Sequence, residues 1–404
     1  MSIAAQPLPR DLAQRLRRLK PADSEYAIQF VEMLLTTACE VHASDVHLQP
    51  THQGLEIRWR LDGVLQLIGE FPRGEAADVI ARLKVLSELL TYRTETPQEG
   101  RIRDKHARVE IRVSTFPTLY GERAVIRLFA SEGKFLYLED LQLPQSVVEP
   151  LRRFLAETSG AILITGPAGS GKTTTAYACL REIVRASAGG KSVASLEDPI
   201  EFAVDGVAQS QVNRAAEFDL AMGLRSLMRQ DPEVILVGEI RDRDTAELTL
   251  QAALTGHLVI TTFHAGSCVG ALSRLSDMGL EPYQLRSGIL AILSQRLVRK
   301  LCSCATEIES DAEKLQLPIQ HGKQPHGCAS CWQTGYQGRT LLAELLSLNH
   351  SALGPAILAR REAKELERAA IESGFTPLLE RAAAAVGAGI TSPAEVRRVL
   401  GFGI

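Results

Sequence analysis

The sequence predicts an α/β protein, with a largely parallel sheet covered by helices and a smaller α+β domain before it. Four short apolar runs carry this prediction, because helical stretches separate them and each run ends in polar or glycine-rich residues. The runs occupy residues 161–165, 192–196, 234–237 and 257–262. Ligands bind outside the carboxyl ends of parallel strands, so we expect the four polar clusters to meet at one edge of the sheet.

The part of the chain before these runs mixes two periodicities. Helical patterns cover residues 25–39 and 76–90, and strand-like runs lie at 46–48, 55–61, 64–68, 109–114 and 123–129. Together they predict a small α+β domain of ordinary size. The expected organisation is a polar tail at 1–22, the α+β domain at 23–131, a linker at 132–145, the sheet domain at 146–297, a four-cysteine module at 298–343 and a helical region at 344–404.

Composition limits the classes of function. The chain has 404 residues and a net charge of −3, so it has room for several domains and no bulk charge that favours a nucleic-acid partner. It contains no long apolar run and no apolar signal segment near its start, so a cytoplasmic location is expected. In a reducing compartment, clustered cysteines indicate metal binding rather than disulfides.

The segment after the first apolar run fits the pattern G-x-x-x-x-G-K-[ST], with a helical stretch at 174–185 behind it. It consists of Gly166, Pro167, Ala168, Gly169, Ser170, Gly171, Lys172 and Thr173, and Thr174 follows. Its glycines let successive backbone N–H groups point at phosphate oxygens, and the helix N-terminus adds positive potential. We expect Lys172 to reach the β- and γ-phosphates of a nucleoside triphosphate and Thr173 to hold Mg²⁺.

Ionisable residues follow the other three runs. Glu197 and Glu239 stand where a carboxylate beside a phosphate loop can hold Mg²⁺ through water or orient the attacking water; a solvated loop acid is the alternative for each. His257 and His264 flank the fourth run, seven residues apart. On an uninterrupted strand their imidazoles face opposite sides of the sheet, so at most one of them can touch the nucleotide. A packing histidine is the alternative for each.

Four of the seven cysteines form a late cluster. Cys302 and Cys304 are followed after 23 residues by Cys328 and Cys331. Four thiolates suit a tetrahedral structural Zn²⁺, although the tight C-x-C pair presents its sulfurs less easily than C-x-x-C. Idle or partly ligating cysteines are the alternative. The scattered Cys39, Cys179 and Cys268 are expected to be packing residues.

In their order and spacing, these segments resemble the type II/IV secretion ATPases, the GspE/PilB/PulE-like family. The segments that carry the resemblance are the phosphate loop, Leu-Glu-Asp-Pro-Ile-Glu at 196–201, the stretch from Arg229 to Asp242, Thr-Gly-His-Leu-Val at 255–259 with His264, and upstream 43–50, 60–63, 97–102 and 112–123. The resemblance covers roughly residues 25 to 400. It implies a RecA-like P-loop ATPase core with a PAS-like N-terminal domain, in a short form that lacks the usual N-terminal extension domain.

The resemblance also assigns roles. It makes Glu239 the catalytic acid that polarises water and Glu197 a support for Mg²⁺ or for the water. His257 becomes the phosphate sensor, with His264 as its companion.

In this family, arginines of the N-terminal domain reach the nucleotide's phosphates, and Arg112 and Arg127 fit those positions best, with Arg123 a weaker candidate. A guanidinium there neutralises charge that grows in the transition state. Arginines that merely face solvent from strands are the alternative.

The function implied by the resemblance is a hexameric ATPase that hydrolyses ATP with Mg²⁺ and powers assembly of a pilus or pseudopilus. It would work at the cytoplasmic face of the inner membrane through a platform protein, without direct contact to nucleic acid. The alternatives are a retraction motor or a type IV secretion motor of the same superfamily, and a nucleotide-binding scaffold without turnover. The four-cysteine module favours assembly.

Overall fold

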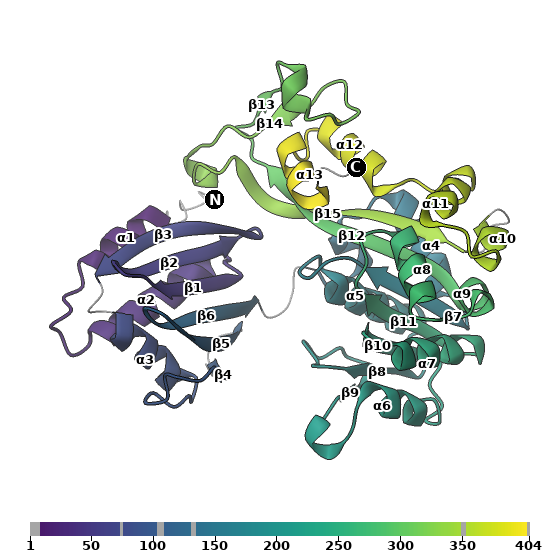
Figure 1. The fold of residues 1–404 in the computed structure, drawn as a ribbon, viewed down its shortest axis with the longest axis horizontal. Coiled ribbons are helices and arrows are strands. Elements are labelled where there is room, and N and C mark those ends of the chain that lie inside the picture. The colour runs from purple at the N-terminus through teal and green to yellow at the C-terminus, as the bar shows by residue number, and fades with distance from the viewer. Residues whose placement is uncertain (1–8, 73–75, 103–108, 131–134, 349–352, 402–404) are drawn as a thin grey trace. The chain divides into compact units, whose positions relative to one another are not determined.

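The computed structural model describes residues 9–72, 76–102, 109–130, 135–348 and 353–401 (Figure 1). These residues form two compact units. The N-terminal unit contains the described residues before the linker together with Cys302–Cys304 and His326–Gly338, and the core unit contains the others. Within these described ranges, no helix combines the length and the apolar character needed to cross a membrane.

The N-terminal unit is built on a six-stranded antiparallel sheet with the order β3-β2-β1-β6-β5-β4. Its elements are α1 (Pro9–Arg17), α2 (Tyr26–Glu40), β1 (Asp45–Pro50), β2 (Gly54–Leu61), β3 (Val64–Pro72), α3 (Ala76–Leu86), β4 (Gln98–Ile102), β5 (Val109–Thr118) and β6 (Gly121–Ala130). Alternation along the strands produces one apolar face: Leu55, Ile57 and Trp59 of β2 are fully buried, whereas Arg58 and Arg60 point to the other face. The predicted α+β domain has this architecture, with β4 as a strand that the patterns did not indicate.

Helix α1 corrects the expectation of a polar tail at 1–22. Leu12 and Leu16 are 1 % exposed and belong to the same apolar core as the buried face of the sheet. They are four residues apart and therefore lie on one face of the helix. Because most residues of this segment are polar, its composition indicated a tail. The two leucines are nevertheless enough to bury one face of a helix.

The core unit is built on a seven-stranded sheet with the order β15-β12-β7-β11-β10-β8-β9. Its strands are β7 (Gly160–Thr165), β8 (Val193–Glu197), β9 (Ala208–Gln211), β10 (Val234–Ile240), β11 (Leu258–Phe263), β12 (Ile289–Leu301) and β15 (Tyr336–Ser347), besides the short pair β13 (Thr306–Glu307) and β14 (Lys323–Gln324). Its helices are α4 (Gln145–Leu155), α5 (Lys172–Ala186), α6 (Leu220–Leu227), α7 (Arg243–Leu254), α8 (Cys268–Asp277), α9 (Pro282–Gly288), α10 (Leu353–Leu358), α11 (Ala363–Glu372), α12 (Leu378–Gly387) and α13 (Pro393–Leu400). The pairs formed by β12, β7, β11, β10, β8 and β9 are all parallel, so the predicted α/β class is confirmed.

Both faces of this sheet are buried, as continuous apolar strands require. On β7, Ala161 and Leu163 pack with residues of α7, α8 and α9, whereas Ile162 and Ile164 pack with residues of α4 and α5. Because the strands are parallel, the loops after β7, β8, β10 and β11 open at one edge of the sheet.

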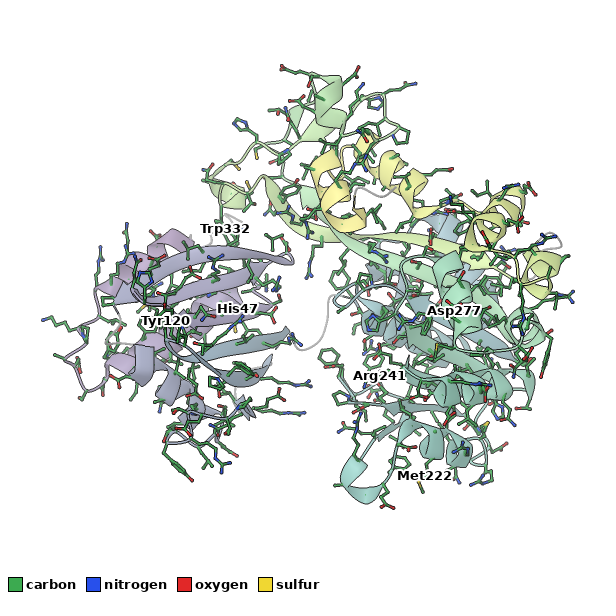
Figure 2. The ribbon with its side chains drawn as sticks, viewed as in Figure 1. His47, Tyr120, Met222, Arg241, Asp277 and Trp332 are labelled. Carbon is green, nitrogen blue, oxygen red and sulfur yellow. The ribbon has the colours of Figure 1, made fainter. Side chains whose placement is uncertain are left out.

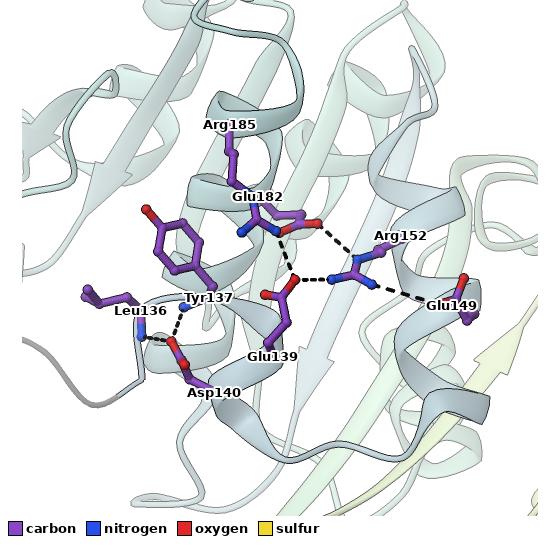
Figure 3. A network of polar contacts seen from close by, with 8 residues as sticks. All are labelled: Leu136, Tyr137, Glu139, Asp140, Glu149, Arg152, Glu182 and Arg185. Carbon is purple, nitrogen blue, oxygen red and sulfur yellow. Dashed lines mark hydrogen bonds and ion pairs between the residues drawn. The ribbon is translucent and has the colours of Figure 1, made fainter.

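The expected linker at 132–145 is mostly part of the core unit. A short 3₁₀ helix, η2 (Leu138–Leu141), buries Leu138 and Leu141 in the apolar core that contains α4 and α5. Around it, Glu139 pairs with Arg152 and Arg185, and Arg185 also lies 4.7 Å over the Tyr137 ring (Figure 3). These ion pairs are largely exposed and contribute little to stability, so burial of the two leucines is what holds the segment on the core unit.

Candidate nucleotide site

The phosphate loop runs from the end of β7 to the start of α5, the context that its pattern requires. Gly169 and Gly171 adopt left-handed φ values of 73° and 88°, which other residues rarely adopt. At Gly166 a Cβ atom would lie 2.6 Å from the carbonyl oxygen of Gln295, so a side chain there would collide with backbone. Thr173 and Thr174 are exposed at the start of the helix, where a hydroxyl can reach a ligand.

Lys172 is nearly buried behind this loop. Its Nζ donates hydrogen bonds to the carbonyl oxygens of Gly166 (3.0 Å) and Pro167 (3.1 Å). Burial lowers the pKa of Lys172, and the negative charge of Glu239 opposes that shift. The ammonium at the start of α5 and the carboxylate near the end of β10 therefore act on each other at this edge.

Two residues of β12 that sequence patterns did not single out hold the phosphate loop and the segment after β11. Gln295 is fully buried and its Nε2 donates to the carbonyl oxygen of Ser170 at 2.8 Å. The guanidinium of Arg296 donates to the carbonyl oxygens of Gln295 and Gly266, and its burial lowers the pKa of Arg296. The sequence signal for these residues was a pair of polar side chains inside a long apolar strand. Buried polar side chains need hydrogen-bond partners, so such a pair indicates specific contacts.

Glu239 sits near the end of β10, and His264 and Arg241 contact its two carboxylate oxygens. Its Oε1 lies 2.6 Å from His264 Nε2, and its Oε2 accepts from Arg241 Nε at 2.7 Å. Arg241, labelled in Figure 2, also lies 3.4 Å from Asp198 after β8. The side chain of Glu239 remains 19 % exposed, so a water molecule can approach it.

The two histidines lie at opposite ends of β11, which corrects the assignment of His257 to the nucleotide site. The strand begins at Leu258, one residue later than expected, and His257 precedes it with Nδ1 donating to the carbonyl oxygen of Ala252 at 3.0 Å. At about 3.3 Å per residue, the strand separates His257 from His264 by roughly 20 Å. His264, the expected companion, is the histidine that meets Glu239.

Glu197 ends β8 and is 3 % exposed. Its two carboxylate oxygens accept hydrogen bonds from the side chains of Tyr177, Ser195 and Gln209. The expected acid is therefore at the correct edge, but its oxygens are occupied by protein donors.

Arg112 and Arg127 lie on the open face of the N-terminal sheet and are direct cross-strand partners on β5 and β6. Arg127 is 63 % exposed and its Nε lies 3.1 Å from Asp45 Oδ1; Asp45 also lies 3.3 Å from Arg60. The weaker candidate, Arg123, contacts His47 Nδ1 at 3.1 Å, and burial together with Arg123 lowers the pKa of His47.

The four predicted cysteines come together within the N-terminal unit, and their sulfur atoms all lie within 4.8 Å of one another. Three pairs are 3.7 to 3.8 Å apart: Cys302 with Cys328, Cys304 with Cys331, and Cys328 with Cys331. A tetrahedron of sulfurs with Zn–S bonds of about 2.3 Å has edges of about 3.8 Å, so these residues fit such an ion. The short C-x-C spacing does not prevent the fit, because each of its cysteines faces a different cysteine of the second pair.

The site and fold define a class, that of P-loop nucleotide-binding proteins with a parallel α/β core. Residues 20–398 match the type II/IV secretion system protein family, and the chain belongs to this family. It is 40 % identical over 388 residues to a type II secretion system protein E of Klebsiella pneumoniae, covering 94 % of this chain and 77 % of the relative. It is 39 % identical over 401 residues to the type II secretion system ATPase E of Vibrio cholerae, covering 97 % and 79 %.

Solved structures agree on the fold. The Legionella pneumophila ATPase DotB superposes with a TM-score of 0.66 at 23 % identity, covering 92 % of this chain and 95 % of DotB. The pilus retraction motor PilT, solved with ADP, superposes with a TM-score of 0.62 at 23 % identity, covering 91 % and 96 %.

We expect purified protein to contain about one zinc ion per chain, and Cys331→Ser to lose most of it, because a thiolate ligand is removed. Metal content is measured by elemental analysis, and a chelator titration is followed through the fluorescence of Trp332, which directly follows Cys331. Cys39→Ser, outside the cluster in the same unit, is the control and should keep the metal. Freshly purified wild-type protein without metal would contradict the assignment.

Proposed function

We propose that this chain hydrolyses ATP to ADP and phosphate and uses the energy to drive assembly of a pilus or pseudopilus. The observation that carries the proposal is that the phosphate loop with Lys172 and the Glu239–His264 pair lie at the same edge of the sheet. A cation, a partly exposed carboxylate and a histidine are the groups that binding a triphosphate and directing a water molecule require.

Each residue has a defined task in this reaction. The backbone N–H groups of residues 166–173 and the Lys172 ammonium bind the phosphates, and Lys172 leaves the loop carbonyls to do so. Thr173 would hold Mg²⁺, which would neutralise part of the charge of the phosphates. Glu239 orients the attacking water. His264 holds Glu239 and senses the γ-phosphate, in place of His257.

Two observations favour assembly over the related functions. A type IV pilus assembly ATPase of Acinetobacter baylyi is 38 % identical over 394 residues, and the relatives reported above are type II secretion proteins. The four-cysteine cluster supports the same conclusion, because the resemblance to the assembly ATPases includes this module.

We extend the proposal to the assembly. The chain forms a homohexamer, Arg112 and Arg127 neutralise phosphate charge during hydrolysis, and the cysteines hold Zn²⁺. The ring works on the cytoplasmic side of the inner membrane through a platform protein. Electron microscopy of the purified protein with nucleotide tests the ring, and a sixfold particle is the expected result; a monomer at all concentrations would contradict it.

Glu239→Gln should reduce ATP turnover by at least about 100-fold while nucleotide affinity changes little, because the amide cannot accept the proton or orient water as the carboxylate does. Turnover is measured by phosphate release and binding by a fluorescent ATP analogue. Glu247→Gln removes an exposed carboxylate on α7 and is the control. If Glu239→Gln retained turnover, Glu239 would not be the catalytic acid.

Substitutions of the two histidines are expected to have opposite effects on ATP turnover. His264→Ala should lower turnover about 10- to 100-fold, because Glu239 loses its partner, whereas His257→Ala should leave turnover close to wild type. Steady-state hydrolysis and thermal unfolding are measured together, so that a fall in stability is not mistaken for lost chemistry. If His257→Ala lost turnover while fully folded and His264→Ala kept it, the assignment of the phosphate sensor to His257 would be restored.

Arg112→Ala and Arg127→Ala should each lower kcat at least tenfold and change the KM for ATP much less, since a guanidinium that acts on transition-state charge contributes mainly to kcat. Arg58→Ala is the matched control, because Arg58 lies on the same sheet face and its Nε is 2.6 Å from Glu56. Unchanged kcat in both variants would remove the arginines from the reaction.

A further inference from the structure

A buried polar network joins the helix after the phosphate loop to the loop after β8, and the mechanism above does not use it. Tyr177 of α5 is 2 % exposed and Glu197 at the end of β8 is 3 % exposed. The Tyr177 hydroxyl donates to Glu197 Oε2. Ser195 Oγ and Gln209 Nε2 donate to Oε1 at 2.6 and 3.1 Å.

The network leaves Glu197 little capacity for another ligand. A buried carboxylate is costly unless hydrogen bonds satisfy it, and three side-chain donors do so here. Burial raises the pKa of Tyr177 well above its ordinary value, and the neighbouring carboxylate raises it further, so the phenol stays protonated and remains a donor.

The same residues fasten the loop between β8 and β9. The Tyr177 hydroxyl accepts from the backbone N–H of Glu201 at 3.2 Å. Gln209 donates to the carbonyl oxygen of Phe202 at 3.0 Å and accepts from the N–H of Val204 at 2.7 Å. One phenol therefore holds both the acid and the backbone that follows it.

This loop leads to the proposed catalytic acid. Asp198, directly after Glu197, lies 3.4 Å from Arg241 Nη1, and Arg241 Nε lies 2.7 Å from Glu239. A shift of the loop would move Asp198 and with it the guanidinium that orients Glu239.

We propose that Tyr177 is a positioning residue, which links the helix of the phosphate loop to Glu239 by holding Glu197 and the loop at 198–207. In this arrangement Glu197 is the hub of the network and not a ligand of Mg²⁺ or of the attacking water. The proposal rests on the proposed ATP hydrolysis for its kinetic consequence, but its structural consequence can be measured without turnover.

The first test compares Tyr177→Phe with Thr175→Val. Thr175 lies on the same helix, is fully buried, and its hydroxyl has no partner among the described residues, so the control removes a hydroxyl without touching the network. Amide hydrogen exchange of residues 198–207 should rise at least about tenfold in Tyr177→Phe and stay at the wild-type rate in Thr175→Val. Equal protection in all three proteins would overturn the proposal, whether or not the chain hydrolyses ATP.

The second test is a double-mutant cycle in ATP turnover. Tyr177→Phe should lower kcat about tenfold with little change in the KM for ATP, and it should have almost no further effect in a Glu197→Gln background, because both variants break the same link. Independent, multiplicative effects would overturn the positioning role. A second contradicting result would be a shifted Mg²⁺ dependence of turnover in Glu197→Gln together with an unchanged kcat in Tyr177→Phe. Glu197 would then take part directly in the reaction, and the positioning role of Tyr177 would be overturned. If the wild-type protein lacked turnover, the proposed function would fail, and the exchange experiment would still decide the role of Tyr177.

Discussion

The core unit depends on one constraint, the burial of a parallel sheet on both faces. Strands such as β7 and β11 are buried along their whole length and contain no charged residue, so charged side chains are placed beyond their ends. Every group that can act on a phosphate is thereby directed to the carboxyl edge. Residues as distant in the chain as Lys172, Glu239 and His264 meet there because each follows or ends a strand of the same sheet.

Concentrating charge at one edge creates a second requirement, since partly buried ions must be compensated. Glu239 is held by His264 and Arg241, and Glu197 is held by three neutral donors. The two acids differ as a result: Glu239 keeps a partly exposed carboxylate between His264 and Arg241, and Glu197 is enclosed. This difference in environment is the physical basis for giving them different tasks.

The N-terminal unit obeys the same rule with a sheet that is buried on one face only. The face that packs against α1, α2 and α3 is apolar, and the opposite face carries the arginines, with Asp45 between Arg60 and Arg127. Strand alternation therefore separates the residues that hold this unit together from those that can act on an anion.

The sequence by itself determined much of what rests on local spacing, although helix α1 and strand β4 were missed. The glycines and Lys172 of the phosphate loop, the four strands of the core sheet, and the two cysteine pairs were all predicted, because short-range patterns dictate turns, strand burial and ligand geometry. Placement of Glu239 at the site edge followed from the strand that carries it. The helical periodicity at 25–39 likewise corresponds to α2.

Tertiary structure decided which distant groups are partners. His264 follows the carboxyl end of β11 and His257 precedes its start, so His264 and not His257 meets Glu239. Gln295 reaches Ser170 across 125 positions of the chain, and Tyr177 reaches Glu197 from another element. No local pattern records such pairs, because a hydrogen bond between distant residues depends on strand order and register, which only the folded sheet defines.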